Sequence, residues 1–325
     1  MEHPLERWAH EICAQHGLVF REELRRTTHD LSAELRNLIW DVEQDDRRAV
    51  LKVYDDDVVN VEAESLRDFH RSNRSGVLTA PDLYLYEIAS LTKGWLLIER
   101  LGNDGHFLES PLEEGARERF VELFCEYRRN FPQGPNRPLA LAEMQDAYRF
   151  HSFRTMQSLE KASTREQQRA FAGDPAVLEQ SEVLPRLERA MDFIRAAFKE
   201  RALHWGHGHF KANDVFVHGD GRWTITDFGH TKMLPEGYEE ALAIWWDQMV
   251  TPVPGGYGPW RAAIDDWVRR FLDAEPELDP DLLQASLLER ALATVLESIA
   301  LADDMAPQDR RARLERQYRL IDELS

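Results

Sequence analysis

The sequence has 325 residues, of which 43% are hydrophobic and 30% are charged. This composition is typical of a globular protein with enough apolar side chains for two lobes. The formal net charge of −19 argues against a nucleic-acid partner, because most of the surface would repel phosphate groups. No apolar run approaches about 18 residues, and the N-terminus carries acids where a signal peptide carries bases. We therefore expect a cytoplasmic protein with no membrane partner.

The first hundred residues favour a small β-rich unit. Residues 4–16 have the apolar spacing of an amphipathic helix. Three runs of β-type residues follow, with a turn at residues 45–46, and predict an antiparallel meander. The third run is Ala49–Tyr54, in which Lys52 and Tyr54 point to the same side of the strand.

A helix is predicted for residues 61–72, and one of its two early glutamates is placed to face inward. Glu62 has Leu66 at i+4, on the apolar face, whereas Glu64 lies among charged neighbours. The alternative is that both glutamates are solvated. Two further β runs, 82–87 and 94–102, complete this unit.

The rest of the chain reads as helical, so we divide it into domains 1–104 and 105–325. A capping box with proline at the first helical position, Ser110-Pro111-Leu112-Glu113, predicts a helix start. A second helical pattern extends to about residue 162, and a third runs from about 175 to Leu203. Three more helical patterns follow the loop at residues 251–260.

The stretch from 204 to 230 carries the chemistry and reads HWGHGHFKANDVFVHGDGRWTITDFGH. Its two β runs, residues 215–217 and 223–226, are joined by His-Gly-Asp-Gly, which suits a tight hairpin turn. Polar motifs flank this hairpin on both sides. HGHFK and Asn-Asp come before it, and Asp-Phe-Gly comes after it.

These motifs resemble the catalytic loop, hairpin and metal-binding loop of the aminoglycoside phosphotransferase and choline kinase family, which writes H-G-D-F-x-P-x-N and then D-F-G or D-W. Aligned without gaps, the family's histidine falls on His207 and its catalytic aspartate on His209. Its asparagine falls on Asp214 and its metal-binding aspartate on Asp227. The segment around Lys52 resembles the kinase strand whose lysine holds the ATP phosphates.

The resemblance implies an α+β, two-lobed protein-kinase-like fold, with a small antiparallel N-terminal lobe and a larger helical C-terminal lobe. It also implies transfer of the γ-phosphate of ATP to a hydroxyl group of a small molecule. The residues it assigns to nucleotide are Lys52 paired with Glu62, the hinge residues Glu99, Arg100 and Leu101, and Lys211, which the alternative interpretation leaves as a solvated lysine. Asp214 and Asp227 would bind Mg²⁺, and His207 would brace the catalytic loop.

The loop departs from the family pattern at its catalytic position. His209 stands where an aspartate accepts the proton of the substrate hydroxyl. Imidazole can act as a general base, worth roughly 10²- to 10⁴-fold, so we predict an active enzyme. The alternative is a catalytically inactive, kinase-like nucleotide-binding protein.

Two further ambiguities concern which residues form the site. A literal H-G-D also occurs at residues 218–220, but Ile225 stands where a metal ligand should follow, so we interpret Asp220 as a turn residue. Asn213 is a one-residue-shifted alternative to Asp214.

The sequence also permits a zinc site and an acceptor pocket. His204, His207 and His209 could bind Zn²⁺ in a hydrolase, a lesser alternative. Several aromatic residues with nearby acids are interpreted as core packing, and the alternative is that they bind a cationic acceptor by cation–π contact. These residues are Trp245, Trp246, Tyr257, Trp260 and Trp267, with Asp247, Asp265 and Asp266.

Overall fold

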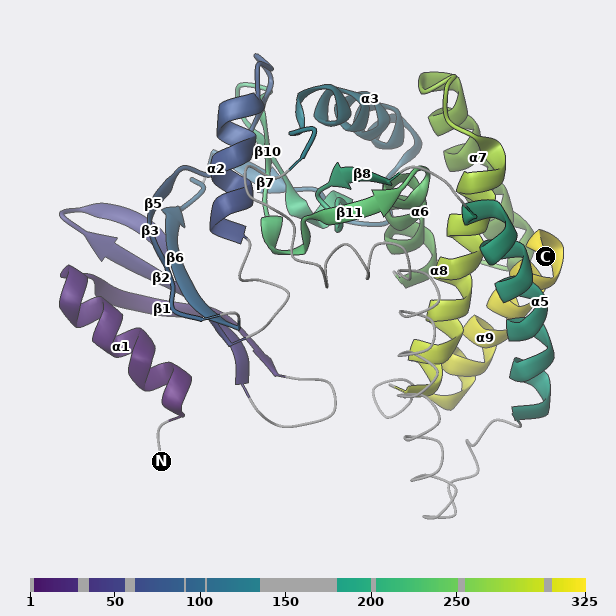
Figure 1. The fold of residues 1–325 in the computed structure, drawn as a ribbon, viewed down its shortest axis with the longest axis horizontal. Coiled ribbons are helices and arrows are strands. Elements are labelled where there is room, and N and C mark those ends of the chain that lie inside the picture. The colour runs from purple at the N-terminus through teal and green to yellow at the C-terminus, as the bar shows by residue number, and fades with distance from the viewer. Residues whose placement is uncertain are drawn as a thin grey trace.

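The computed structural model describes residues 3–28, 35–55, 62–90, 92–102, 104–134, 180–199, 203–250, 255–300 and 306–325. A five-stranded sheet with helices α1 and α2 lies on one side of the molecule, and the helices α5 to α9 lie on the other (Figure 1). The predicted α+β architecture is confirmed. The helical pattern predicted to end near residue 162 lies outside the described residues.

The N-terminal sheet is antiparallel throughout, with strand order β1-β2-β3-β6-β5. The predicted meander is confirmed, and its turn at Asp45 and Asp46 has positive φ at both residues (50° and 62°), as in a tight hairpin turn. The elements are α1 (Pro4–His16), β1 (Val19–Thr28), β2 (Leu35–Gln44), β3 (Arg47–Asp55), α2 (Glu62–Ser72), β5 (Leu83–Ile88) and β6 (Lys93–Glu99).

Strand β3 lies between two apolar clusters, because its side chains point alternately to the two faces of the sheet. Leu51 and Val53 are buried in the cluster that also contains α1, whereas Tyr54 belongs to the cluster with α2. Lys52 therefore points to the α2 side of the sheet, because side chains alternate along a strand. Lys52 is 7% exposed.

A second sheet contains the predicted hairpin, β9 (Val215–His218) and β10 (Trp223–Ile225). The strand β7 (Gly105–Phe107) pairs with β9, and β4 (Leu78–Thr79) pairs in parallel with β10. A third, two-stranded sheet joins β8 (Leu203–Gly206) to β11 (Lys232–Pro235).

The remaining described elements are helical. They are α3 (Glu114–Asn130), α5 (Gln180–Phe198), the 3₁₀ turns η1 (Ala212–Asp214) and η2 (Phe228–His230), α6 (Tyr238–Ile244), the π-helical segment η3 (Trp245–Val250), α7 (Tyr257–Ala274), α8 (Pro280–Ala300) and α9 (Pro307–Leu324). The three C-terminal helices confirm the prediction, although α7 begins at Tyr257, inside the loop predicted for residues 251–260. None of the helices in the described ranges is long and apolar enough to cross a membrane.

Two further predicted helix boundaries are wrong. Helix α3 begins at Glu114 rather than at the Ser110 capping box, because the backbone N–H of Leu112 donates to the Asp247 carboxylate over 2.7 Å instead. Helix α5 ends at Phe198, and Leu203 opens strand β8. Both differences come from contacts with residues distant in sequence, which a local pattern does not contain.

Candidate active site

Two short paired strands, β8 and β11, flank the segment that contains the hairpin and its polar motifs. Gly206 at the end of β8 pairs with Lys232 at the start of β11. The two ends of the segment between them, which contains the hairpin, therefore lie side by side (Figure 1). This anchors the residues before and after the hairpin relative to each other.

Buried hydrogen bonds hold the backbone of His207 and Gly208. The N–H of His207 donates to the Tyr127 hydroxyl over 2.7 Å, and the N–H of Gly208 donates to the Glu239 carboxylate over 3.0 Å. The Tyr127 hydroxyl donates in turn to Glu239. Burial lowers the pKa of His207, and the neutral ring donates from Nε2 to the carbonyl oxygen of Thr226. His207 therefore connects the loop before the hairpin to Thr226, the residue that directly follows the hairpin.

Gly208 has a backbone that only glycine adopts without strain. Its φ is +78°, and an added Cβ would lie 2.1 Å from the carbonyl oxygen of His230. Gly221 in the hairpin turn also has positive φ, +86°, but an added Cβ there meets nothing within 4 Å.

Gly208→Ala is expected to lower the free energy of unfolding by at least about 3 kcal/mol, since it combines left-handed strain with a backbone clash. The matched Gly221→Ala variant should lose only about 1 kcal/mol, because it has the strain alone. Urea unfolding of both variants measures the difference. Equal losses would mean that the loops do not approach each other as closely as described.

The three histidines of the zinc alternative have separate partners. His204 lies 3.4 Å from a Glu239 oxygen and contacts Arg128, and His207 binds the backbone of Thr226. Burial raises the pKa of the Glu239 carboxyl. The hydrogen bond from His204 and the charge of Arg128 outweigh this effect and lower that pKa to about 2. The described structure thus does not bring the three histidines together as one metal site.

Lys52 lies between two acids from different parts of the chain. Its Nζ is 2.5 Å from Glu62 Oε2 and 3.2 Å from Asp227 Oδ1. Burial lowers the pKa of the Lys52 ammonium. The two carboxylates outweigh this effect and hold that pKa above its usual value. The expected ion pair with Glu62 is present, and Glu62 is buried while Glu64 is partly exposed. A strand, a helix and the loop after the hairpin therefore meet at one ammonium group.

His209 and Asp214 form the neighbouring half of the site. His209 Nδ1 lies 3.4 Å from Asp214 Oδ2 and 3.7 Å from Asp227 Oδ2. The Lys211 ammonium contacts both oxygens of Asp214, and it lies 3.0 Å from His209 Nδ1. Lys211 is only 5% exposed, so the structure does not support its interpretation as a solvated lysine.

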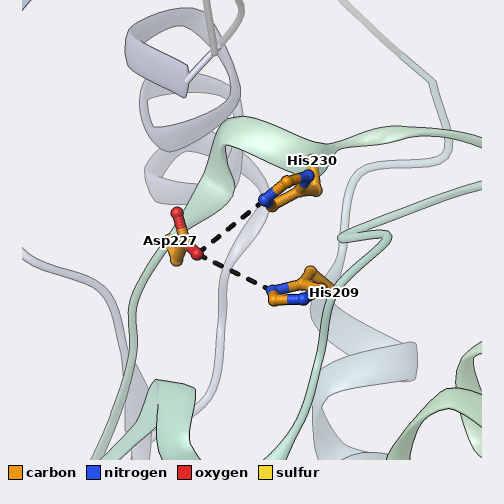
Figure 2. A group of neighbouring side chains, drawn as sticks. All are labelled: His209, Asp227 and His230. Carbon is orange, nitrogen blue, oxygen red and sulfur yellow. Dashed lines mark ion pairs between the residues drawn. The ribbon is translucent and has the colours of Figure 1, made fainter. Parts of the chain in front are cut away.

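His230 is a site residue that the sequence interpretation missed. Its Nε2 lies 4.0 Å from Asp227 Oδ2, and its ring centroid is 4.5 Å from that of His209. Figure 2 shows both imidazoles directed at the Asp227 carboxylate. Burial and the nearby positive charges lower the pKa of His230 well below its usual value. The sequence feature that could have identified His230 is its position directly after Asp227-Phe228-Gly229.

The hinge residues lie at the end of β6. The N–H of Glu99 donates to the carbonyl oxygen of Asp82 over 2.8 Å. Arg100 donates to the buried carboxylate of Asp41 over 3.1 Å, and Leu101 is buried. The side chain of Arg100 is therefore held by the sheet.

The two ambiguous residues differ in their surroundings. Asp220 is exposed and accepts from the backbone N–H of Arg222 over 3.0 Å, which agrees with a turn residue. Asn213 accepts from Trp246 over 2.6 Å, while Asp214 faces His209. The ungapped position, Asp214, is therefore the one whose carboxylate lies near His209 Nδ1, as that of Asp227 does.

The interpretation as core packing is confirmed for Trp245, Trp260 and Trp267, which are buried. Trp260 and Trp267 are 2% and 1% exposed. Trp267 donates to the buried Asp247, and Trp245 donates to Thr294. Asp265 and Asp266 pair with arginines, and Tyr257 donates to Glu323. Trp246 alone of this group contacts the described site, with its ring centroid 4.9 Å from Lys211 Nζ.

The donor set suits a magnesium nucleotide. Carboxylate oxygens, which Asp214 and Asp227 offer, are the ligands that Mg²⁺ prefers. Lys52 and Lys211 could provide positive charge for phosphate oxygens in an otherwise acidic protein. The imidazoles of His209 and His230 are additional nitrogen donors that Mg²⁺ does not require.

Comparison with solved structures confirms a protein-kinase-like fold, as found in small-molecule kinases. A thermostable mutant of aminoglycoside phosphotransferase APH(4)-Ia, in ternary complex with ADP and hygromycin B, is 15% identical with a TM-score of 0.57, over 96% of this chain and 97% of that chain. The choline/ethanolamine kinase family protein from Mesorhizobium loti is 14% identical with a TM-score of 0.53, over 97% and 94%. Ethanolamine kinase from Plasmodium vivax is 11% identical with a TM-score of 0.54, over 93% and 82%.

The resemblance to aminoglycoside phosphotransferases and choline kinases predicted from the sequence is therefore confirmed in the fold. The sequence matches no protein-family model. Comparison with curated proteins finds no match either.

Proposed function

We propose that the protein is a phosphotransferase that moves the γ-phosphate of ATP to a hydroxyl group of a small molecule. The observation that carries this proposal is the contact of Lys52 with both Glu62 and Asp227. It places a buried ammonium group beside a carboxylate suited to a metal, which is the charge arrangement that phosphoryl transfer requires. Residues 1–104 would form the nucleotide-binding lobe, and residues 105–325 would carry the catalytic loop and the acceptor pocket.

The bound ligands of the structural neighbours support this assignment. Thermostable mutants of APH(4)-Ia have been solved in ternary complexes of ADP or AMP-PNP with hygromycin B. Here, the backbone of the hinge from Glu99 to Leu101 would hydrogen-bond the base. Lys52 would contact the phosphates, and Glu62 would hold Lys52 in place.

The second group of residues would act near the transferred phosphate. Mg²⁺ held by Asp214 and Asp227 would neutralise negative charge on the phosphate oxygens. Lys211 lies against Asp214 and would contact the same phosphate. His207 would brace the loop through Thr226.

His209 would accept the proton of the acceptor hydroxyl. Its Nδ1 atom lies 3.4 Å from Asp214 Oδ2 and 3.7 Å from Asp227 Oδ2. The ring is partly exposed, so an acceptor can reach it. A carboxylate is therefore not needed at this position for base catalysis.

A screen of hydroxyl acceptors with γ-labelled ATP tests the proposal. The panel includes hygromycin B, choline, ethanolamine and a fructosamine, and it records both ADP release and label on the acceptor. Label transfer that depends on Lys52 supports the enzyme. ATP binding without transfer to any acceptor would favour the catalytically inactive nucleotide-binding protein.

A further inference from the structure

Two imidazoles and one carboxylate converge where the catalytic and metal-binding loops meet (Figure 2). His209, Asp227 and His230 each offer one ligand atom, and these atoms lie within 4.8 Å of one another. The Asp227 oxygen is 3.7 Å from one nitrogen and 4.0 Å from the other. Bonds of about 2.0–2.2 Å place tetrahedral ligand atoms about 3.4 Å apart, so small side-chain movements would complete such a site.

The backbone holds these side chains in this arrangement before any ion arrives. Gly208 lies directly against the carbonyl oxygen of His230, which fixes the two loops at closest approach. Asp227 has positive φ, 64°, and the buried ring of Phe228 that follows it packs against His207 and Phe69. The three side chains are partly exposed, so an ion can enter from solvent.

The donor atoms select a class of metal. Imidazole nitrogen favours zinc, copper, nickel and cobalt, whereas Mg²⁺ prefers oxygen ligands throughout. We propose that His209, Asp227 and His230 bind one divalent transition-metal ion of the zinc type, and that this ion blocks phosphotransfer. The blocking half rests on the proposed function, because it requires His209 as the base and Asp227 as a magnesium ligand.

The physical reason for inhibition is that the two functions share two side chains. An ion bound at His209 Nδ1 removes the imidazole lone pair that would face a proton. The same ion occupies Asp227 Oδ2 and thereby competes with Mg²⁺. Two cations oppose the ion, Lys52 at 3.2 Å from Asp227 and Lys211 at 3.0 Å from His209.

Cobalt binding tests the site without reference to activity. Co²⁺ is titrated into the full chain without nucleotide, and visible absorption reports its coordination. We expect one Co²⁺ per wild-type chain and an affinity at least about 10-fold weaker in His230→Ala, which lacks a ligand. His106→Ala, at an exposed histidine on β7, is the matched control and should bind as wild type does.

Lys211→Met provides a test in the opposite direction. It removes the ammonium 3.0 Å from His209 Nδ1, and Co²⁺ should then bind about 10-fold more tightly. Equal Co²⁺ affinities in wild type, His230→Ala and Lys211→Met would overturn the site. This pair of variants keeps the test valid even if one of them folds poorly.

Zinc inhibition of ADP release tests the blocking half. At fixed MgATP and acceptor, the Zn²⁺ concentration that halves the rate should rise at least about 10-fold from His106→Ala to His230→Ala, each measured against its own rate without Zn²⁺. Turnover supported by Zn²⁺ in place of Mg²⁺ would overturn inhibition. If no acceptor gives turnover, the proposed function and the inhibition both fail, and Co²⁺ binding alone decides the site.

Discussion

Replacing His209 by alanine is expected to lower the turnover number by on the order of 10²-fold or more, since a positioned base contributes roughly that much. The affinity for MgATP should change only a few-fold, because the base acts on the acceptor hydroxyl rather than on the nucleotide. ADP release at saturating substrates measures the first quantity, and a nucleotide titration measures the second.

Two further variants make this result specific. His209→Asp should retain turnover, because a carboxylate can accept the same proton, with Lys52 and Lys211 nearby to balance its charge. His106→Ala, at an exposed histidine on β7, should behave as wild type. Equal rates for wild type and His209→Ala, at measurable turnover, would eliminate His209 as the base and leave positioning and electrostatics to carry the reaction.

Lys52→Met is expected to abolish measurable transfer and to lower the free energy of unfolding by about 3–5 kcal/mol, as observed when one partner of a buried ion pair is removed. The reason is that Glu62 and Asp227 then face each other's negative charge without the ammonium between them. Urea unfolding and ADP release measure the two effects. Lys93→Met, at an exposed lysine paired with Asp55, is the matched control. Its rate of ADP release and its free energy of unfolding should stay close to those of the wild type.

The double variant Lys52→Met/Glu62→Gln separates the two effects. Neutralising Glu62 removes most of the unbalanced charge, so stability should recover by more than half relative to Lys52→Met. Transfer should stay absent, because no ammonium remains for the phosphates. Recovery of transfer together with stability would show that Lys52 acts only as a structural ion-pair partner.

The pairing of Lys52 with a glutamate was expected from the family resemblance, and local periodicity selected Glu62 as that glutamate. Strand alternation sets the side of the sheet to which Lys52 points, and the i+4 relation of Glu62 to Leu66 sets the buried face of α2. The hairpin of β9 and β10 was predicted for the same reason, since its turn residues and β runs are contiguous.

Other features depend on contacts between distant residues, which periodicity does not encode. Strand β8 forms because it pairs with β11, some thirty residues later, and its own sequence resembles the end of a helix. Helix α3 begins late because Asp247 holds the backbone of Leu112.

His230 was missed although its position carried a signal. It directly follows the Asp-Phe-Gly motif, but the family pattern ends at the glycine and assigns the next residue no role. Its proximity to His209 appears only when Gly208 brings the two loops together. Chemistry that departs from a family pattern is therefore found by geometry rather than by motif.

The most direct test of the account is a calorimetric titration of MgATP into the wild-type protein beside Asp227→Ala and Asp220→Ala. Asp227 contacts Lys52 and lies at the centre of the site, whereas Asp220 is an exposed turn residue. We predict saturable binding at or below millimolar concentration in wild type and Asp220→Ala, and a loss of at least about 10-fold in Asp227→Ala. A wild-type protein that binds no nucleotide at millimolar MgATP would contradict the account.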